Sequence, residues 1–114
     1  MRGTMLIFRP YETRPPEIRH VNGPPTLELL KAAIGGGWLE PVPYFHTIEH
    51  DGLRHNCVAF CDEEGKLKQF DYNPEATIRW DQAMRRAVGC GCRPDVLVGD
   101  VVVVFGDREF MEAL

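Results

Sequence analysis

LELLKAAIGGGWLEPVP, residues 27–43, runs a helix-forming segment into three consecutive glycines and then into a tryptophan. Apolar residues recur at helical spacing before the glycines and Thr26 is a candidate N-cap, so we expect a helix over 26–34. The glycines stand at the carboxyl end of that helix, where the dipole is negative, which makes them a poor phosphate cradle. We expect Gly35 to cap the helix in the left-handed conformation and a strand to follow over 38–42.

Two hairpins are expected in the middle of the chain. Asp51-Gly52 is the strongest turn signal, and a two-residue loop there places His46 opposite Cys57. DEEGK, residues 62–66, separates the segments VAFC and LKQF with a glycine where a left-handed residue is wanted. This pattern predicts a second hairpin, with the acidic residues of its turn in solvent.

The two ends of the chain are expected to be largely β-structure. Residues 5–9 form a β-prone run that ends before Pro10, and residues 18–21 can pair back on it. Residues 101–105 are apolar at every position, which is typical of a strand buried on both faces. Residues 108–114 form a tail that is either a short helical end or frayed.

A second helix is expected to begin at Asn73-Pro74-Glu75, where Asn caps, Pro fits the first turn and Glu meets the helix dipole. Gly89 is its expected stop. The β-branched residues Thr77 and Ile78 weaken its first part, so a turn followed by a shorter helix is the alternative.

These elements predict a single α+β domain over residues 1–114, with a mostly antiparallel sheet of about five strands. The helix over 26–34 is expected to be the main one and to pack on one face of the sheet. The order of hairpin, helix and hairpin is compatible with a β-grasp-like arrangement. The expected core is Leu6, Ile7, Leu27, Leu30, Ile34, Trp38, Val42, Val58, Phe60, Leu67, Val101, Val103 and Phe105.

Composition narrows the classes of function. The chain has 114 residues, of which 44% are hydrophobic and 26% charged, with a net charge of −4. Nucleic-acid binding is not expected, since it usually requires a basic excess. No apolar run reaches the roughly 20 residues of a membrane span, and we see no signal peptide, so the expected location is the cytoplasm. The four cysteines are expected to be reduced there, and no cofactor is expected.

Several short motifs together resemble a known family of small domains of unknown function, family number 3846. The motifs are R-P at 9–10, L-x-x-L at 27–30, G-G-x-x-E-x-V at 36–42, DEEGKL at 62–67, N-x-x-A-T at 73–77 and DVLVGDVVVV at 95–104. The resemblance covers roughly residues 5–106 and leaves 107–114 as a tail. It implies an accessory protein of bacteriophages, plasmids or other mobile elements, and it transfers no site residue. The histidine-bearing hairpin and the segment RRAVGCGCRP, residues 85–94, depart from the family pattern.

The histidine-bearing hairpin is the candidate site for metal or thiol chemistry. Strand alternation places His46, His50, His55 and Cys57 on one face, and His46, His55 and Cys57 are the candidate metal ligands. Cys57 and Cys61 are four residues apart on a strand, about 13 Å between α-carbons, so they cannot share a tetrahedral zinc. Cys57 with His46 could also form a nucleophile pair. The simpler interpretation is a half-exposed face that carries polar residues, with Cys57 as a small buried hydrophobe.

Candidate binding residues lie elsewhere. Glu40 is a carboxylate on a strand and must face water, a partner or a cation. Trp38 is expected in the core, but an exposed Trp38 beside Glu40 would mark a binding surface. Arg79 and Arg85 could contact an acidic partner, or belong to a solvated helix face.

The sequence therefore favours a non-enzymatic accessory protein that binds a host protein or a small ligand. The alternative is a metal- or thiol-dependent enzyme built on the His46, His55 and Cys57 face.

Overall fold

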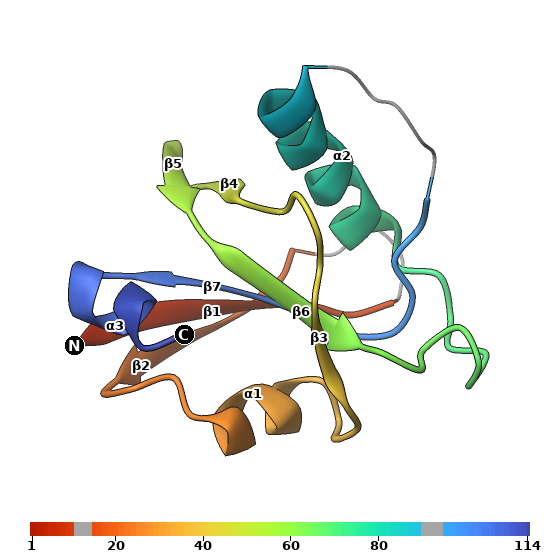
Figure 1. Ribbon diagram of the computed structural model, residues 1–114, viewed down its shortest axis with the longest axis horizontal. Coiled ribbons are helices and arrows are strands. Elements are labelled where there is room, and N and C mark those ends of the chain that lie inside the picture. Colours follow the sequence, from red (N-terminus) through yellow and green to blue (C-terminus); the bar gives the residue numbers. More distant parts are fainter. Residues whose placement is uncertain (11–14, 90–94) are drawn as a thin grey trace.

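The computed structural model describes residues 1–10, 15–89 and 95–114. It is an α+β structure with a five-stranded antiparallel sheet in the order β2-β1-β7-β6-β3 and a separate two-stranded ribbon, β4–β5 (Figure 1). The elements along the chain are β1 (Arg2–Phe8), β2 (Glu17–Asn22), α1 (Leu27–Ala33), β3 (Leu39–Pro41), β4 (Thr47–His50), β5 (Leu53–Asn56), β6 (Val58–Asp62), α2 (Pro74–Val88), β7 (Val101–Gly106) and α3 (Arg108–Glu112).

The sheet carries a hydrophobic core on each face. β7 lies in the middle of the sheet between β1 and β6, and Val101–Val104 are fully buried, which confirms the predicted two-sided burial. Alternate residues of β7 and β1 point to opposite faces, so each strand contributes to both cores. One core contains Leu6, Phe8, Val101, Val103 and Phe105, and the other contains Met5, Ile7, Val102 and Val104.

The helices cover both faces. α2 and the β4–β5 ribbon lie over one core through residues such as Trp80, Ala83 and Ile48, and α1 and α3 lie over the other through Leu30 and Phe110 (Figure 1). The expectation that the helix over 26–34 is the main one was wrong. α1 has seven residues and α2 has fifteen, because the Asn73 cap offsets the weak helix propensity of the β-branched residues that follow.

The Asp51-Gly52 hairpin forms as predicted. His50 lies opposite Leu53 in the β4–β5 ribbon, and the backbone N–H of Cys57 donates to the carbonyl of His46 at 2.8 Å. The β1–β2 hairpin is also confirmed. The tail forms the short helix α3, and its Phe110 is fully buried against Gly3 and Gly106.

The predicted second hairpin was wrong. Residues 63–69 form consecutive turns, with hydrogen bonds such as Lys68 N–H to the Glu64 carbonyl at 2.9 Å, instead of a strand. The physical reason is that both edges of β6 are already occupied, by β7 on one side and β3 on the other. Along the chain, the β4–β5 ribbon stands between β3 and β6, which pair with each other. The strands that follow α1 therefore do not form the single hairpin of a β-grasp-like order.

Three residues predicted for the core are exposed instead. Leu67 is 85% exposed because it lies in the turns after β6, and Leu27 is 56% exposed because it stands at the start of α1. Trp38 is 62% exposed. Val58 and Phe60 are half-buried, and the other predicted core residues are buried.

The turn after α1 has the expected left-handed backbone. Thr26 caps α1 by accepting a hydrogen bond from the N–H of Leu29 at 3.2 Å. Gly35 and Gly37 have φ of +78° and +88°, a region that glycine adopts at little cost. The glycines thus allow the chain to reverse from α1 into β3.

Asn73 joins α2 to the sheet. Its side chain is fully buried, and its Nδ2 donates to the carbonyls of Phe8 and Gly99, both at 2.8 Å. Its Oδ1 accepts from the N–H of Ala76 at 3.2 Å and so caps the helix. One side chain therefore fixes the end of β1, the approach to β7 and the start of α2 relative to one another.

In the part of the chain that the structure covers, no helix is both long enough and apolar enough to cross a membrane.

Candidate functional site

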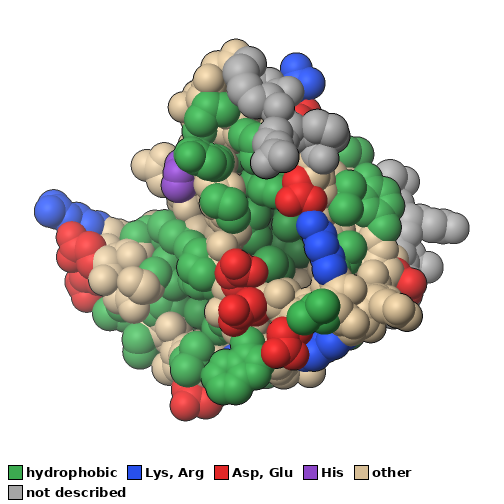
Figure 2. Space-filling model, turned by 45° about the vertical axis from the view of Figure 1, so that its right-hand side comes forward, with side chains coloured by type: hydrophobic (Ala, Val, Ile, Leu, Met, Phe, Trp, Pro, Cys, Tyr) green, Lys and Arg blue, Asp and Glu red, His purple; other side chains and the backbone are tan. Residues whose placement is uncertain are grey.

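A groove of about 260 Å³ opens between the edge strand β3, the end of β6 and residues 95–98. Trp80 of α2 also lines it, and its indole Nε1 donates to the carbonyl of Pro43 at 2.7 Å. The lining combines apolar residues with four acids and one lysine, namely Val42, Leu97, Val98, Glu40, Asp62, Glu63, Asp95 and Lys66. Figure 2 brings this side of the molecule forward and shows acidic side chains beside a hydrophobic hollow.

The charges of the described residues at the rim do not balance. Lys66 Nζ is 2.7 Å from Asp95 Oδ1 across the groove. Glu40 and Glu63 are exposed, and neither forms an ion pair with another described residue. The groove therefore presents two free carboxylates next to apolar surface, a combination that attracts a cationic and partly apolar group.

Asp62 anchors the end of β6 beneath the groove. Burial alone would raise the pKa of its carboxyl, but hydrogen bonds from Lys68 Nζ and from the backbone of Glu64, both at 2.9 Å, and from the backbone of Trp38 hold that pKa below its usual value. Asp62 is therefore ionised and already satisfied by its own neighbours. It positions the Trp38 turn and is not a free ligand.

Cys61 lies in the groove as a neutral thiol. Burial raises its pKa to about 11, and the carboxylates of Glu40 and Asp62 add to the shift. Cys57, on the same side of the sheet, has a pKa raised to about 12 by burial, and its Sγ lies 3.6 Å from the carbonyl of Phe45. The thiolate is the nucleophile and the metal ligand, so neither described cysteine is prepared for either role at neutral pH.

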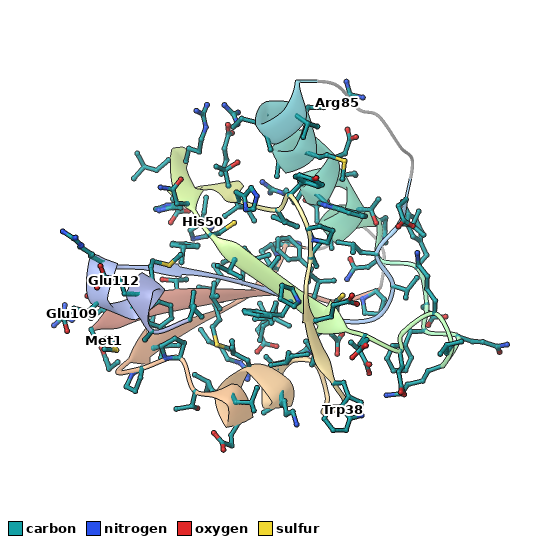
Figure 3. The ribbon with its side chains drawn as sticks, in the orientation of Figure 1. Met1, Trp38, His50, Arg85, Glu109 and Glu112 are labelled. Atoms are coloured by element: carbon teal, nitrogen blue, oxygen red, sulfur yellow. The ribbon has the colours of Figure 1, made fainter. Side chains whose placement is uncertain are left out.

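Trp38 stands just before β3 and projects away from the sheet (Figure 3). Lys31 Nζ of α1 lies 5.1 Å from the centroid of its ring, a cation–π contact. The Trp38 carbonyl accepts from the N–H of Glu63 at 2.8 Å, so this exposed aromatic residue adjoins the acidic rim. Trp38 and Glu40 are thus both exposed at the start of β3. This is the alternative in which Trp38 marks a binding surface, and not the one in which it belongs to the core.

The candidate metal residues are distributed over different environments. His55 stacks on Phe105 with 4.1 Å between ring centroids, Cys57 is buried, and His46 is exposed beside Tyr44. Among the residues with described positions, no three His, Cys, Asp or Glu side chains gather closely enough to hold a metal ion. Cys90 and Cys92 lie outside the described residues.

The two arginines predicted to bind a partner already form hydrogen bonds within the protein. Arg79 Nε is 3.1 Å from Glu75 Oε1, and its Nη1 donates to the carbonyl of Glu49 at 3.1 Å. Arg85 Nε is 2.9 Å from Asp81 Oδ2 on the exposed side of α2. Arg79 therefore connects α2 to the ribbon, whereas Arg85 belongs to a solvated helix face.

Sequence reasoning missed Asp62 and Cys61 as parts of the groove. The burial of Asp62 could have been predicted, because Val58, Phe60 and Asp62 are every second residue of β6 and so share the face that packs against the core on the α1 side. The contribution of residues 95–98 had no local signal, since these residues reach the groove only through tertiary folding.

No protein-family model matches the chain, and neither a curated protein nor a solved structure shows significant similarity to it. The resemblance to family 3846 stays a prediction.

Proposed function

We propose that this chain is a non-enzymatic accessory protein that binds a basic, partly apolar segment of a partner protein in the groove beside β3. The observation that carries the proposal is the exposed Trp38 next to a groove whose Glu40 and Glu63 have no basic partner among the described residues. Exposed tryptophans are strongly enriched among the residues that dominate binding energy. Free carboxylates at the rim favour a partner of opposite charge and speed its approach.

The state of the thiols supports binding over catalysis. Cys57 and Cys61 are held as neutral thiols by burial, and the structure describes no histidine in contact with either of them as a base. Nucleophilic catalysis by cysteine requires such a base or a lowered pKa. No specific observation favours the alternative of a metal- or thiol-dependent enzyme on the His46, His55 and Cys57 face.

The proposal includes a cellular setting. The resemblance to family 3846 supports an origin in phages, plasmids or other mobile elements, and the partner would then be a host protein. The setting would be the cytoplasm, where the thiols of Cys57 and Cys61 would stay reduced.

Intrinsic fluorescence tests the proposal directly, because one of the chain's two tryptophans lines the groove and the other stands beside its rim. We expect a saturable change in emission with a peptide of alternating Lys and Leu, and none with the matched peptide of Glu and Leu. The affinity should fall as salt rises, since the attraction is between exposed charges. Replacing both Glu40 and Glu63 by Gln should weaken binding about tenfold or more.

Glu109→Gln is the matched control. Glu109 is an exposed acid on α3, at the end of the molecule away from Trp38 (Figure 3). It should leave the affinity for the basic peptide within about twofold of the original. Equal binding of the acidic peptide, or an equal loss in Glu109→Gln, would show that the groove does not select its partner. Binding of small amines without binding of the peptide would assign the groove to a small ligand instead.

A further inference from the structure

Three arginines converge on a second cleft, which lies between the β4–β5 ribbon and α2 and measures about 260 Å³. Arg79 and Arg86 come from α2 and are seven residues apart, so they share one helix face. Arg54 comes from β5 and reaches the cleft from the opposite side. Gln82, one turn along the same helix face, also lines the cleft.

The negative charges at this cleft leave the arginines incompletely neutralised. Arg86 Nη2 lies 3.7 Å from Glu49 Oε1, and both side chains are exposed, a geometry that contributes little. Arg79 Nε pairs with Glu75 and its Nη1 donates to the backbone carbonyl of Glu49, which leaves its Nη2 without a partner among the described residues. Arg54 stands directly opposite Glu49 in the ribbon, yet forms no ion pair with a described residue. Among the described residues at the cleft, three guanidinium groups therefore face two carboxylates, those of Glu49 and Glu75.

We propose that this arginine cleft, formed by Arg54, Arg79 and Arg86, binds the phosphate group of a small phosphate monoester. A guanidinium group presents several N–H donors in a planar fork that matches a tetrahedral oxyanion, and a doubly charged phosphate gains from more than one such fork. Gln82 adds an amide donor. The ligand would displace the weak Arg86–Glu49 contact, which requires only the movement of an exposed side chain.

The cleft is a separate site from the groove beside β3. The groove has an acidic rim and lies at the free edge of β3, whereas the arginine cleft lies under the ribbon and is basic. A phosphate ligand and a basic peptide are therefore expected to bind independently, and loss of one activity does not predict loss of the other.

NMR titration with inorganic phosphate and with glycerol phosphate tests the proposal. We expect saturable shifts of the Nε–H signals of Arg79 and Arg86 and of backbone amides in β4 and β5. Sulfate should compete, and acetate should bind more weakly because it carries one charge. Arg54→Gln and Arg86→Gln should each weaken binding about tenfold.

Two further variants make the test decisive. Arg85→Gln is the control, because Arg85 neighbours Arg86 but projects away from the ribbon (Figure 3) and pairs with Asp81. Its affinity should stay within about twofold of the original. Glu49→Gln removes the repelling carboxylate and should strengthen phosphate binding severalfold, a gain that misfolding cannot produce. Shifts that never saturate, an equal loss in Arg85→Gln, or weaker binding in Glu49→Gln would each overturn the proposal.

Discussion

The backbone of Gly37 lies directly against the carboxylate of Asp62. A Cβ on Gly37 would overlap Asp62 Oδ2, and φ at this residue is +88°. Gly37→Ala should therefore destabilise the protein by roughly 2–4 kcal/mol, about 1 from the left-handed backbone and the rest from displacing a buried, hydrogen-bonded carboxylate. Urea denaturation would measure the change.

Gly36→Ala separates the two causes. Gly36 has φ of +90°, but a Cβ there would meet no atom within 4 Å. This variant should lose only about 1 kcal/mol. Equal losses in the two variants would mean that Asp62 moves aside without cost.

The ion pair between Asp62 and Lys68 predicts a pH dependence of stability. The folded pKa of Asp62 lies below its ordinary value of 3.8, so its contribution is fully present above that pH and is lost as pH falls through the folded pKa. Lys68 has its pKa raised above 10.5, so its contribution is present below that pH and is lost as pH rises through the folded pKa. The stability difference between the original protein and Asp62→Asn should therefore be greatest between these limits and should shrink in acid. A difference that is constant from pH 2 to pH 7 in urea melts would contradict this assignment.

Asn73 should be among the least replaceable polar residues in the described chain. Asn73→Ala removes the cap of α2 and leaves the carbonyls of Phe8 and Gly99 without their donor, which should cost roughly 2–4 kcal/mol. Asn73→Asp keeps the cap but turns an oxygen toward two carbonyl oxygens, so it should also be strongly destabilising. Asp107→Ala, which removes the exposed cap of α3, should cost only about 1 kcal/mol. Thermal melts of the three variants would test this ranking.

Local patterns in the sequence predicted most of the elements. The Asp51-Gly52 turn, the caps at Thr26 and Asn73, and the fully apolar Val101–Phe105 each specify a structure within a few residues. The errors came where pairing over long distances decides the outcome. VAFC had two possible partners, and the edge strand β3 took the place that the sequence assigned to LKQF.

The candidate site followed the same division. Glu40 was expected to face water, a partner or a cation because it is a carboxylate on a strand, and its side chain is exposed. The apolar wall formed by residues 96–98 lies more than thirty positions along the chain from the strands β3 and β6, so no local pattern could reveal the groove.

The two described cysteines should react slowly in the folded protein. Burial raises the pKa of Cys57 to about 12 and of Cys61 to about 11, so little thiolate exists at pH 7.5. Alkylation by iodoacetamide, followed by peptide mapping, should be at least about tenfold slower at both residues than in urea, with Cys57 the slower of the two. Rapid labelling of Cys57 in the folded protein would restore the thiol-enzyme alternative.

Trp38→Ala should have little effect on stability although tryptophan is the largest side chain. An expectation based on burial would be a loss of about 3–5 kcal/mol. With 62% of Trp38 exposed, we expect less than about 1 kcal/mol, since most of its surface remains in water in the folded state. Trp80→Ala is the matched comparison, because Trp80 is only 6% exposed and donates a hydrogen bond to Pro43, and it should lose the full 3–5 kcal/mol or so.

Peptide binding should depend on Trp38 although stability does not. Trp38→Ala should weaken the Lys and Leu peptide by about tenfold while the protein stays folded, which is the behaviour of an exposed anchor. Urea melts and the fluorescence titration on the same preparations would measure both effects, with Trp80 reporting the peptide once Trp38 is removed. If Trp38→Ala lost as much stability as Trp80→Ala, the Trp38 indole would be packed in solution, and the groove beside β3 would have no exposed tryptophan at its rim.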